Sequence, residues 1–142
     1  MPLILVIEDQ EDACGLVRRL LMRLGHTVVC LEHGSEADIW LKSHQPDLVI
    51  VGGGRHGELA SERLEVLARR GVSGSRVLLG ARADALEFLR GRFGQRVREI
   101  FSSPQALESL EAMVRKALDE TPAAKTPEEN KGEGPRVPET SY

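Results

Sequence analysis

Five short apolar runs alternate with amphipathic segments along the first 118 residues, and this alternation constrains the fold more than any other feature. The runs are short, apolar and partly β-branched, as expected for strands buried on both faces of a sheet. The amphipathic segments repeat their apolar residues at helical spacing. The predicted strands are 3–7, 27–31, 48–51, 77–79 and 97–101, and the predicted helices are 11–24, 35–44, 58–70, 83–92 and a last one from Pro104 to Leu118.

Alternating strands and helices with short connections predict a parallel sheet that is covered by helices on both faces. Ligands bind to open sheets of this kind at the carboxyl ends of the strands. Residues that carry function are therefore expected directly after the strands, at positions 8–9, 52–56, 80–81 and 102–103.

The composition changes near Asp119. Beyond Thr121 the chain is rich in Pro, Glu, Lys, Gly and Thr, and its one bulky aliphatic residue is Val137. Such a segment buries too little apolar surface to offset the entropy of ordering it. We therefore expect one domain over residues 1–118 and a disordered acidic tail, rich in Pro and Glu, over residues 119–142.

Composition also argues against several functional classes. The formal net charge is -3, so bulk charge does not favour nucleic acid or an anionic membrane as a partner. No stretch of about 18 apolar residues is present, so no membrane span is expected. The apolar N-terminus lacks a basic leader and runs into Glu8 and Asp9, unlike a signal peptide. Cys14 and Cys30 are expected to be free, partly buried thiols in a reducing cytoplasm.

The strand ends resemble the receiver domain of bacterial response regulators. Residues 4–9 (ILVIED) are similar to the family's first strand and its acidic pair, and residues 25–29 (GHTVV) to its entry into the second strand. Residues 45–51 (QPDLVIV) resemble the lead into its third strand, and Ser103-Pro104 stands where the family has Lys-Pro. The resemblance covers residues 3–118. It implies a flavodoxin-like, doubly wound α/β fold: a three-layer αβα sandwich with strand order 2-1-3-4-5.

The family's chemistry uses five groups, and three are replaced here. Glu8 and Asp9 match the acidic pair that holds a divalent cation. Gly52 stands in place of the aspartate that accepts the phosphoryl group, Gly80 in place of a Ser or Thr, and Ser103 in place of a lysine. The resemblance thus implies a degenerate, non-enzymatic receiver, or pseudo-receiver. The aromatic residue of the family's switch would fall at Ile100, next to Phe101.

Two features of this edge have alternative interpretations. Glu8 and Asp9 either bind Mg²⁺ weakly or form an acidic corner without a metal, in which Arg55, Arg82 or solvent replaces the missing lysine charge. The stretch Gly52, Gly53, Gly54, Arg55 and His56 forms either an anion-binding nest or a loop left free to drift. It matches neither a phosphate-loop nor a dinucleotide-binding motif. No other cofactor is expected.

A basic cluster lies around the predicted fourth helix and fifth strand. It contains Arg90, Arg92, Arg96 and Arg98, with Phe101 beside it. The resemblance implies that the fourth helix, fifth strand and fifth helix contact partners or a second copy, and the alternative is a solvated surface. We expect a cytoplasmic, phosphorylation-independent interaction module whose partner is a signalling protein such as a histidine kinase or another regulator. The alternatives are a phosphorylatable single-domain regulator and a small-anion or nucleotide sensor that uses residues 52–57.

Overall fold

All five predicted strands form in the computed structural model, which describes residues 2–102 and 107–120. They lie parallel in one sheet with the predicted order β2-β1-β3-β4-β5. Leu5 of β1 lies opposite Val29 of β2 and Val49 of β3, so the first three strands end close together at one edge. The strands are β1 (Leu3–Ile7), β2 (Thr27–Leu31), β3 (Leu48–Gly52), β4 (Val77–Ala81) and β5 (Glu99–Ser102).

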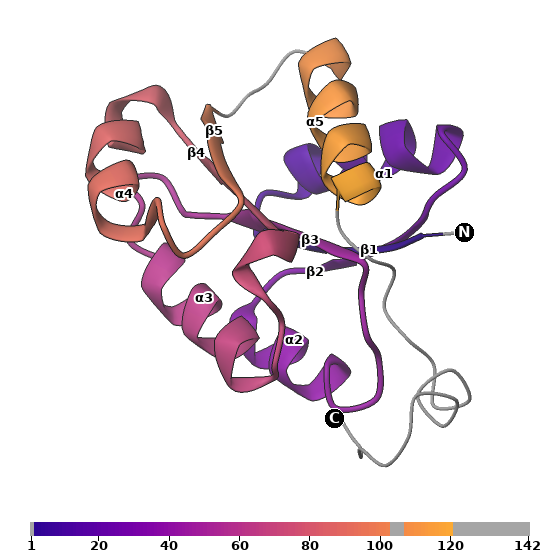
Figure 1. Ribbon diagram of the computed structural model, residues 1–142, viewed down its shortest axis with the longest axis horizontal. Helices are drawn as coiled ribbons and strands as arrows, with labels where there is room; N and C mark the ends of the chain where they lie inside the picture. Colours follow the sequence, from indigo (N-terminus) through magenta and orange to yellow (C-terminus); the bar gives the residue numbers. More distant parts are fainter. Residues whose placement is uncertain (1, 103–106, 121–142) are drawn as a thin grey trace.

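Helices cover both faces of the sheet, which confirms the three-layer sandwich of the flavodoxin-like type (Figure 1). Helices α1 and α5 pack on one face, and α2, α3 and α4 pack on the other. Short 3-10 turns at Gly74–Arg76 and Ala83–Ala85 precede β4 and α4. The helices are α1 (Glu11–Arg23), α2 (Gly34–Trp40), α3 (Ala60–Arg69), α4 (Leu86–Phe93) and α5 (Leu107–Glu120).

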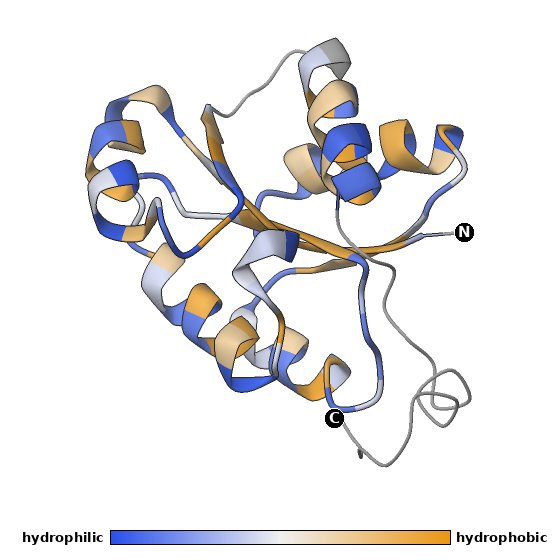
Figure 2. Cartoon of the chain, in the orientation of Figure 1, coloured by the Kyte–Doolittle hydropathy of each residue, from blue (hydrophilic) through white to orange (hydrophobic). Residues whose placement is uncertain are grey.

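The core consists of two apolar clusters, one on each face of the sheet. Apolar strands run through the centre, and the apolar sides of the helices turn towards them (Figure 2). Leu5, Ile7 and Val51 point towards α2, α3 and α4, whereas Ile4 and Val6 point towards α1 and α5. The alternation explains why the central strands are apolar at every position.

Some helix boundaries differ from the predicted ones. Helix α2 begins at Gly34 and ends at Trp40, four residues before the predicted end at His44. Its first turn is held by Glu36, whose carboxylate accepts hydrogen bonds from the amides of Glu32 and His33, 2.9 and 3.1 Å away. Helix α5 extends to Glu120. The predicted disordered tail otherwise falls on residues 121–142, which lie outside the described residues.

The prediction of free cysteines is wrong. Cys14 in the first turn of α1 and Cys30 in β2 form a disulfide. The 16-residue separation gave no local signal of this pair, but α1 folds back along β2 and brings the two Cα atoms to 6.4 Å. That spacing is within the range that disulfides bridge. None of the described helices is long and apolar enough to cross a membrane.

Candidate functional site

The carboxyl edge of the sheet holds a cavity of about 300 Å³, at the place expected for a ligand in this fold. It lies between the loop after β1 and the loops after β3 and β4. Most of the residues predicted to carry function meet there; Ser103 lies outside the described residues. The cavity is lined by Glu8, Asp9, Gln10, Asp12, Ala13, Gly52, Gly53, Gly54, Arg55, Gly80, Ala81 and Arg82.

The Glu8 carboxylate occupies the space in front of Gly52. A Cβ atom built on Gly52 would overlap one carboxylate oxygen of Glu8, with the Glu8 Cδ at 3.0 Å and the other oxygen at 3.4 Å. Glu8 is held there because its Oε2 accepts a hydrogen bond of 2.9 Å from the amide of Gln10. Position 52 therefore lacks an acceptor oxygen, and the space for its side chain is filled by Glu8.

A buried arginine from α3 reaches the same edge. The Arg63 side chain is only 2% exposed, and its Nη2 lies 3.4 Å from Asp9 Oδ1. Nη2 also donates to the carbonyl of Glu32 at 3.2 Å, and Nη1 donates to the carbonyl of Gly52 at 2.7 Å. One guanidinium thus links the ends of β2 and β3 to the loop after β1, where it supplies donors to carbonyls at the sheet edge.

Arg63 is therefore the cation that compensates the acidic pair. The sequence led us to expect Arg55, Arg82 or solvent in this role. Both arginines are exposed at the rim of the cavity, and the ion pair at Asp9 is made by Arg63. Within the described residues, no three His, Cys, Asp or Glu side chains converge as metal ligands do. Because a guanidinium already sits beside Asp9, the pair does not fit the Mg²⁺ site that the resemblance implies.

The environment of Glu8 changes its acidity. Burial raises the pKa of Glu8 above its usual 4.5, and the neighbouring Asp9 charge raises it further. The Gln10 amide and the Arg63 charge partly oppose this rise. The folded chain therefore holds the Glu8 proton more tightly than the unfolded chain does, so ionising Glu8 destabilises the fold.

This shift gives a pH-dependent prediction for Glu8→Gln. As pH rises from about 4.5 through the raised pKa of Glu8, ionisation of Glu8 lowers the stability of the wild-type chain. The variant has no carboxyl group at this position and does not lose this stability. The stability of the variant relative to wild type should therefore improve over that window and then level off. Urea unfolding of both chains at pH 4.5, 5.5, 6.5 and 7.5 measures the difference directly. A difference that stays constant or changes in the opposite direction would contradict the burial of Glu8.

The glycine loop after β3 contains its own anion. The amide of His56 donates to Glu58 Oε1 at 2.8 Å, and the Glu58 carboxylate lies 3.0 Å from the place where a Cβ on Gly54 would stand. Hydrogen bonds from the backbone amides of Glu58 and His56 hold the pKa of Glu58 below its usual range. Gly54 has a φ of 90°, which favours glycine. The loop thus presents amides to a carboxylate, as an anion nest does, but the carboxylate belongs to the chain.

The remaining predicted pocket position, Gly80, lies under an aromatic ring. Phe101 of β5 is opposite Gly80 in the sheet, and its ring atoms lie 2.8–3.4 Å from where a Cβ on Gly80 would stand. Ala81 follows Gly80 and also carries no hydroxyl. Phe101 is 9% exposed and packs with the core on the side of α1 and α5. Its assignment to a partner surface is therefore wrong, because alternation along β5 turns it inward.

The basic cluster is only partly available to a partner. Arg90, Arg92 and Arg96 are exposed, and the guanidinium groups of Arg92 and Arg96 lie 5.5 and 5.3 Å from the centre of the Phe93 ring. Arg98 instead donates to the carbonyl of Ser75 at 2.6 Å and pairs with Glu120 at 2.7 Å. Phe88, which the sequence did not single out, is 57% exposed on α4.

Arg63 and Glu58 were missed because neither belongs to a motif. Arg63 follows Glu62 in an amphipathic helix, where a charged residue is normally solvated. One signal was present: position 63 lies next to Leu64 and one turn before Leu67, so it borders the buried stripe of α3. An arginine at such a position, together with an acidic pair that lacks its lysine, could have indicated the ion pair.

Comparison with known proteins by sequence finds a similar transcriptional regulator. The chain is 31% identical over 125 residues to the phosphate regulon transcriptional regulatory protein PhoB of Rhizobium meliloti (strain 1021). The match covers 84% of this chain and 55% of that protein, so the chain spans about half the length of this relative. No family model matches the chain.

Comparison with solved structures supports the fold. The receiver domain of the Francisella response regulator 1452 superposes with a TM-score of 0.71 at 14% identity, covering 84% of this chain and 98% of that one. A response regulator receiver protein from Burkholderia phymatum superposes with a TM-score of 0.71 at 22% identity, covering 84% of this chain and 96% of that one. The non-phosphorylated HemR receiver domain from Leptospira biflexa superposes with a TM-score of 0.70 at 21% identity, covering 88% of this chain and 100% of that one.

Proposed function

We propose that this chain is a receiver-type domain of the kind found in response regulators, and that it is a signalling module that acts without being phosphorylated. The observation that carries the proposal is the Glu8 carboxylate in front of Gly52. A receiver that accepts a phosphoryl group needs an oxygen nucleophile at this point, and the chain offers a glycine whose side-chain space is already filled.

Two more contacts support the same proposal. Arg63 lies 3.4 Å from Asp9 and compensates part of the charge of the acidic pair without a metal. Phe101 packs over Gly80, where the family needs a hydroxyl for the phosphoryl group. The side-chain positions at Gly52 and Gly80 are thus filled by Glu8 and Phe101, although a cavity remains beside them. We propose that such a domain is not an enzyme.

Signalling by such a domain has to come from docking. We assign this role to the exposed part of α4, where Phe88 is exposed and the exposed Arg92 follows one helical turn later. Aromatic residues and arginine are both enriched at protein contacts. The proposed partner is a cytoplasmic signalling protein, such as a histidine kinase or another regulator, with an acidic and apolar surface. A partner can change the state of the domain only if it binds one conformation better than another.

The proposed function predicts that a small phosphodonor does not modify the chain. The full chain is incubated with Mg²⁺ and acetyl phosphate, and its intact mass is measured beside a receiver domain that has the aspartate. The control should gain one phosphoryl group, and this chain should keep its mass. In amide NMR spectra, the peaks of Glu8, Asp9, Gly52 and Gly80 should also stay in place.

Two results would overturn the proposal. One is a gain of one phosphoryl group that peptide mapping assigns to a single residue, which would make the chain a phosphorylatable regulator. The other is an unchanged mass with saturable shifts at Gly54, Arg55 and His56 when inorganic phosphate is added. The second result would favour the anion sensor and would require phosphate to displace the Glu58 carboxylate from the loop amides.

A further inference from the structure

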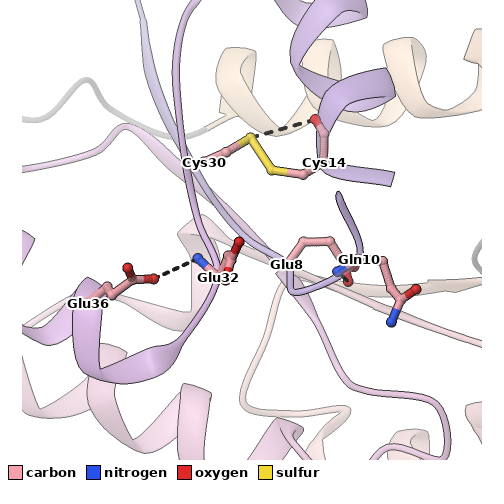
Figure 3. Close-up of a disulfide and its surroundings, with 6 residues drawn as sticks. All are labelled: Glu8, Gln10, Cys14, Cys30, Glu32 and Glu36. Carbon is pink, nitrogen blue, oxygen red and sulfur yellow. Dashed lines mark hydrogen bonds between the residues drawn. A yellow bond between two sulfur atoms is a disulfide. The ribbon is translucent and has the colours of Figure 1, made fainter. Parts of the chain in front are cut away.

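The two cysteines lie beside the candidate site. Cys14 directly follows Ala13, which lines the cavity, and Cys30 stands two residues before Glu32, whose carbonyl accepts a hydrogen bond from Arg63. The disulfide therefore joins the first turn of α1 to strand β2, as Figure 3 shows. The two segments that it joins carry one wall of the cavity and one of the carbonyls that hold Arg63.

The position of the cysteines allows the bond to open and close. Both residues are half-buried rather than sealed in the core, so a small thiol or disulfide can reach them. When the bond is open, the Cys30 thiol still has an acceptor, because the Cys14 carbonyl lies 3.6 Å from Cys30 Sγ. No other cysteine is present in the chain to form a competing pair.

We propose that Cys14 and Cys30 are a reversible thiol–disulfide switch that fixes or releases the wall of the candidate site formed by the first turn of α1. In a reducing cytoplasm, a disulfide is normally a transient, redox-sensing bond rather than a permanent one. The core of this domain is of a size that does not require a disulfide to fold. The inference rests on the proposed cytoplasmic location and on the position of the two sulfurs, but it does not depend on whether the chain is phosphorylated.

The chemistry is an exchange with a low-molecular-weight disulfide such as glutathione disulfide. The thiolate of one cysteine attacks a glutathione sulfur, forms a mixed disulfide and releases one glutathione. The second cysteine, as its thiolate, attacks the protein sulfur of the mixed disulfide and releases the other glutathione. The chain loses two hydrogen atoms and is oxidised by two electrons, and one glutathione disulfide is reduced to two glutathione molecules. A dithiol reverses both steps.

The first experiment measures the bond itself. The full chain is equilibrated with reduced or oxidised glutathione, then unfolded in iodoacetamide without reductant and weighed by mass spectrometry. We expect two alkyl groups on the reduced chain and none on the oxidised monomer. The oxidised chain should also melt about 5–10 °C higher, because the bond closes a loop of 16 residues in the unfolded state. The variant Cys14→Ser/Cys30→Ser should melt at one temperature in both buffers.

The second experiment measures the connection to the site. Amide hydrogen exchange of the oxidised and reduced chains is compared, with the double serine variant as the control that cannot respond. We expect slower exchange in residues 11–14 of the oxidised chain, together with shifted NMR peaks at Ala13 and Glu32. The switch would be overturned by any of three results: two alkyl groups on the chain after oxidation, disulfide-linked dimers, or equal melting temperatures of the oxidised and reduced chains. If hydrogen exchange and NMR peak positions differ only at Cys14 and Cys30, the switch is not connected to the candidate site.

Discussion

Replacing Arg63 with methionine should lower the free energy of unfolding by about 3 kcal/mol, the low end of the range for breaking a buried ion pair. The low end applies because Asp9 is 34% exposed, so water solvates part of the charge that is left behind. The carbonyls of Gly52 and Glu32 also lose their donor, and methionine keeps only the apolar stem of the side chain. Urea unfolding at pH 7 measures the change as a lower midpoint at constant slope.

The matched control for this variant is Arg69→Met. Arg69 lies on the same helix, its side chain is 55% exposed, and its pair with Asp38 is 3.5 Å long. Surface ion pairs of this kind contribute at most about 1 kcal/mol.

In Arg63→Met, a Mg²⁺ titration should also begin to shift the amide peaks of Glu8 and Asp9, because the Arg63 guanidinium is no longer present beside Asp9. If Arg63→Met is as stable as the control, the guanidinium does not hold the strand ends together.

Restoring an aspartate at position 52 should damage the fold rather than revive phosphorylation. In Gly52→Asp the new side chain enters the space of the Glu8 carboxylate and adds a like charge beside it. We expect a loss of about 2–3 kcal/mol, at the upper part of the range for overpacked side chains. Acetyl phosphate should leave the intact mass of this variant unchanged, since Glu8 and Arg63 still occupy the edge.

A second substitution tests whether crowding against Glu8 causes the loss of stability in Gly52→Asp. In Glu8→Ala/Gly52→Asp the space is open again, so most of the lost stability should return and the two changes should be strongly non-additive. Gly91→Ala serves as the control glycine, because a Cβ there has no neighbour within 4 Å in the middle of α4. It should gain about 0.5–1 kcal/mol through helix propensity. If Gly52→Asp alone is stable and accepts a phosphoryl group, Glu8 moves aside freely and does not block the side-chain space at position 52.

Much of the site could be predicted because strand ends are visible in the sequence. Apolar runs end at Ile7, Val51 and Leu79, so Glu8, Gly52 and Gly80 could be assigned to one edge of a parallel sheet before any coordinates. The identity of position 52 also excluded an aspartyl phosphate there. The direction of the Glu8 side chain could not be predicted in this way, since a strand end places the Cα atom and leaves the rotamers of a long side chain open.

The alternation of strands and helices and the missing acceptor at Gly52 were determined by the sequence alone, because periodicity and residue identity are local properties. The order of the strands in the sheet was predicted only through the resemblance to receiver domains. Tertiary structure decided which side chains contact one another at and beside the site. Arg63 meets Asp9 across 54 residues of sequence, and Cys14 meets Cys30 across 16. Such pairs form where packed helices lie against the sheet, and no repeat or motif along the chain records which side chains will meet there.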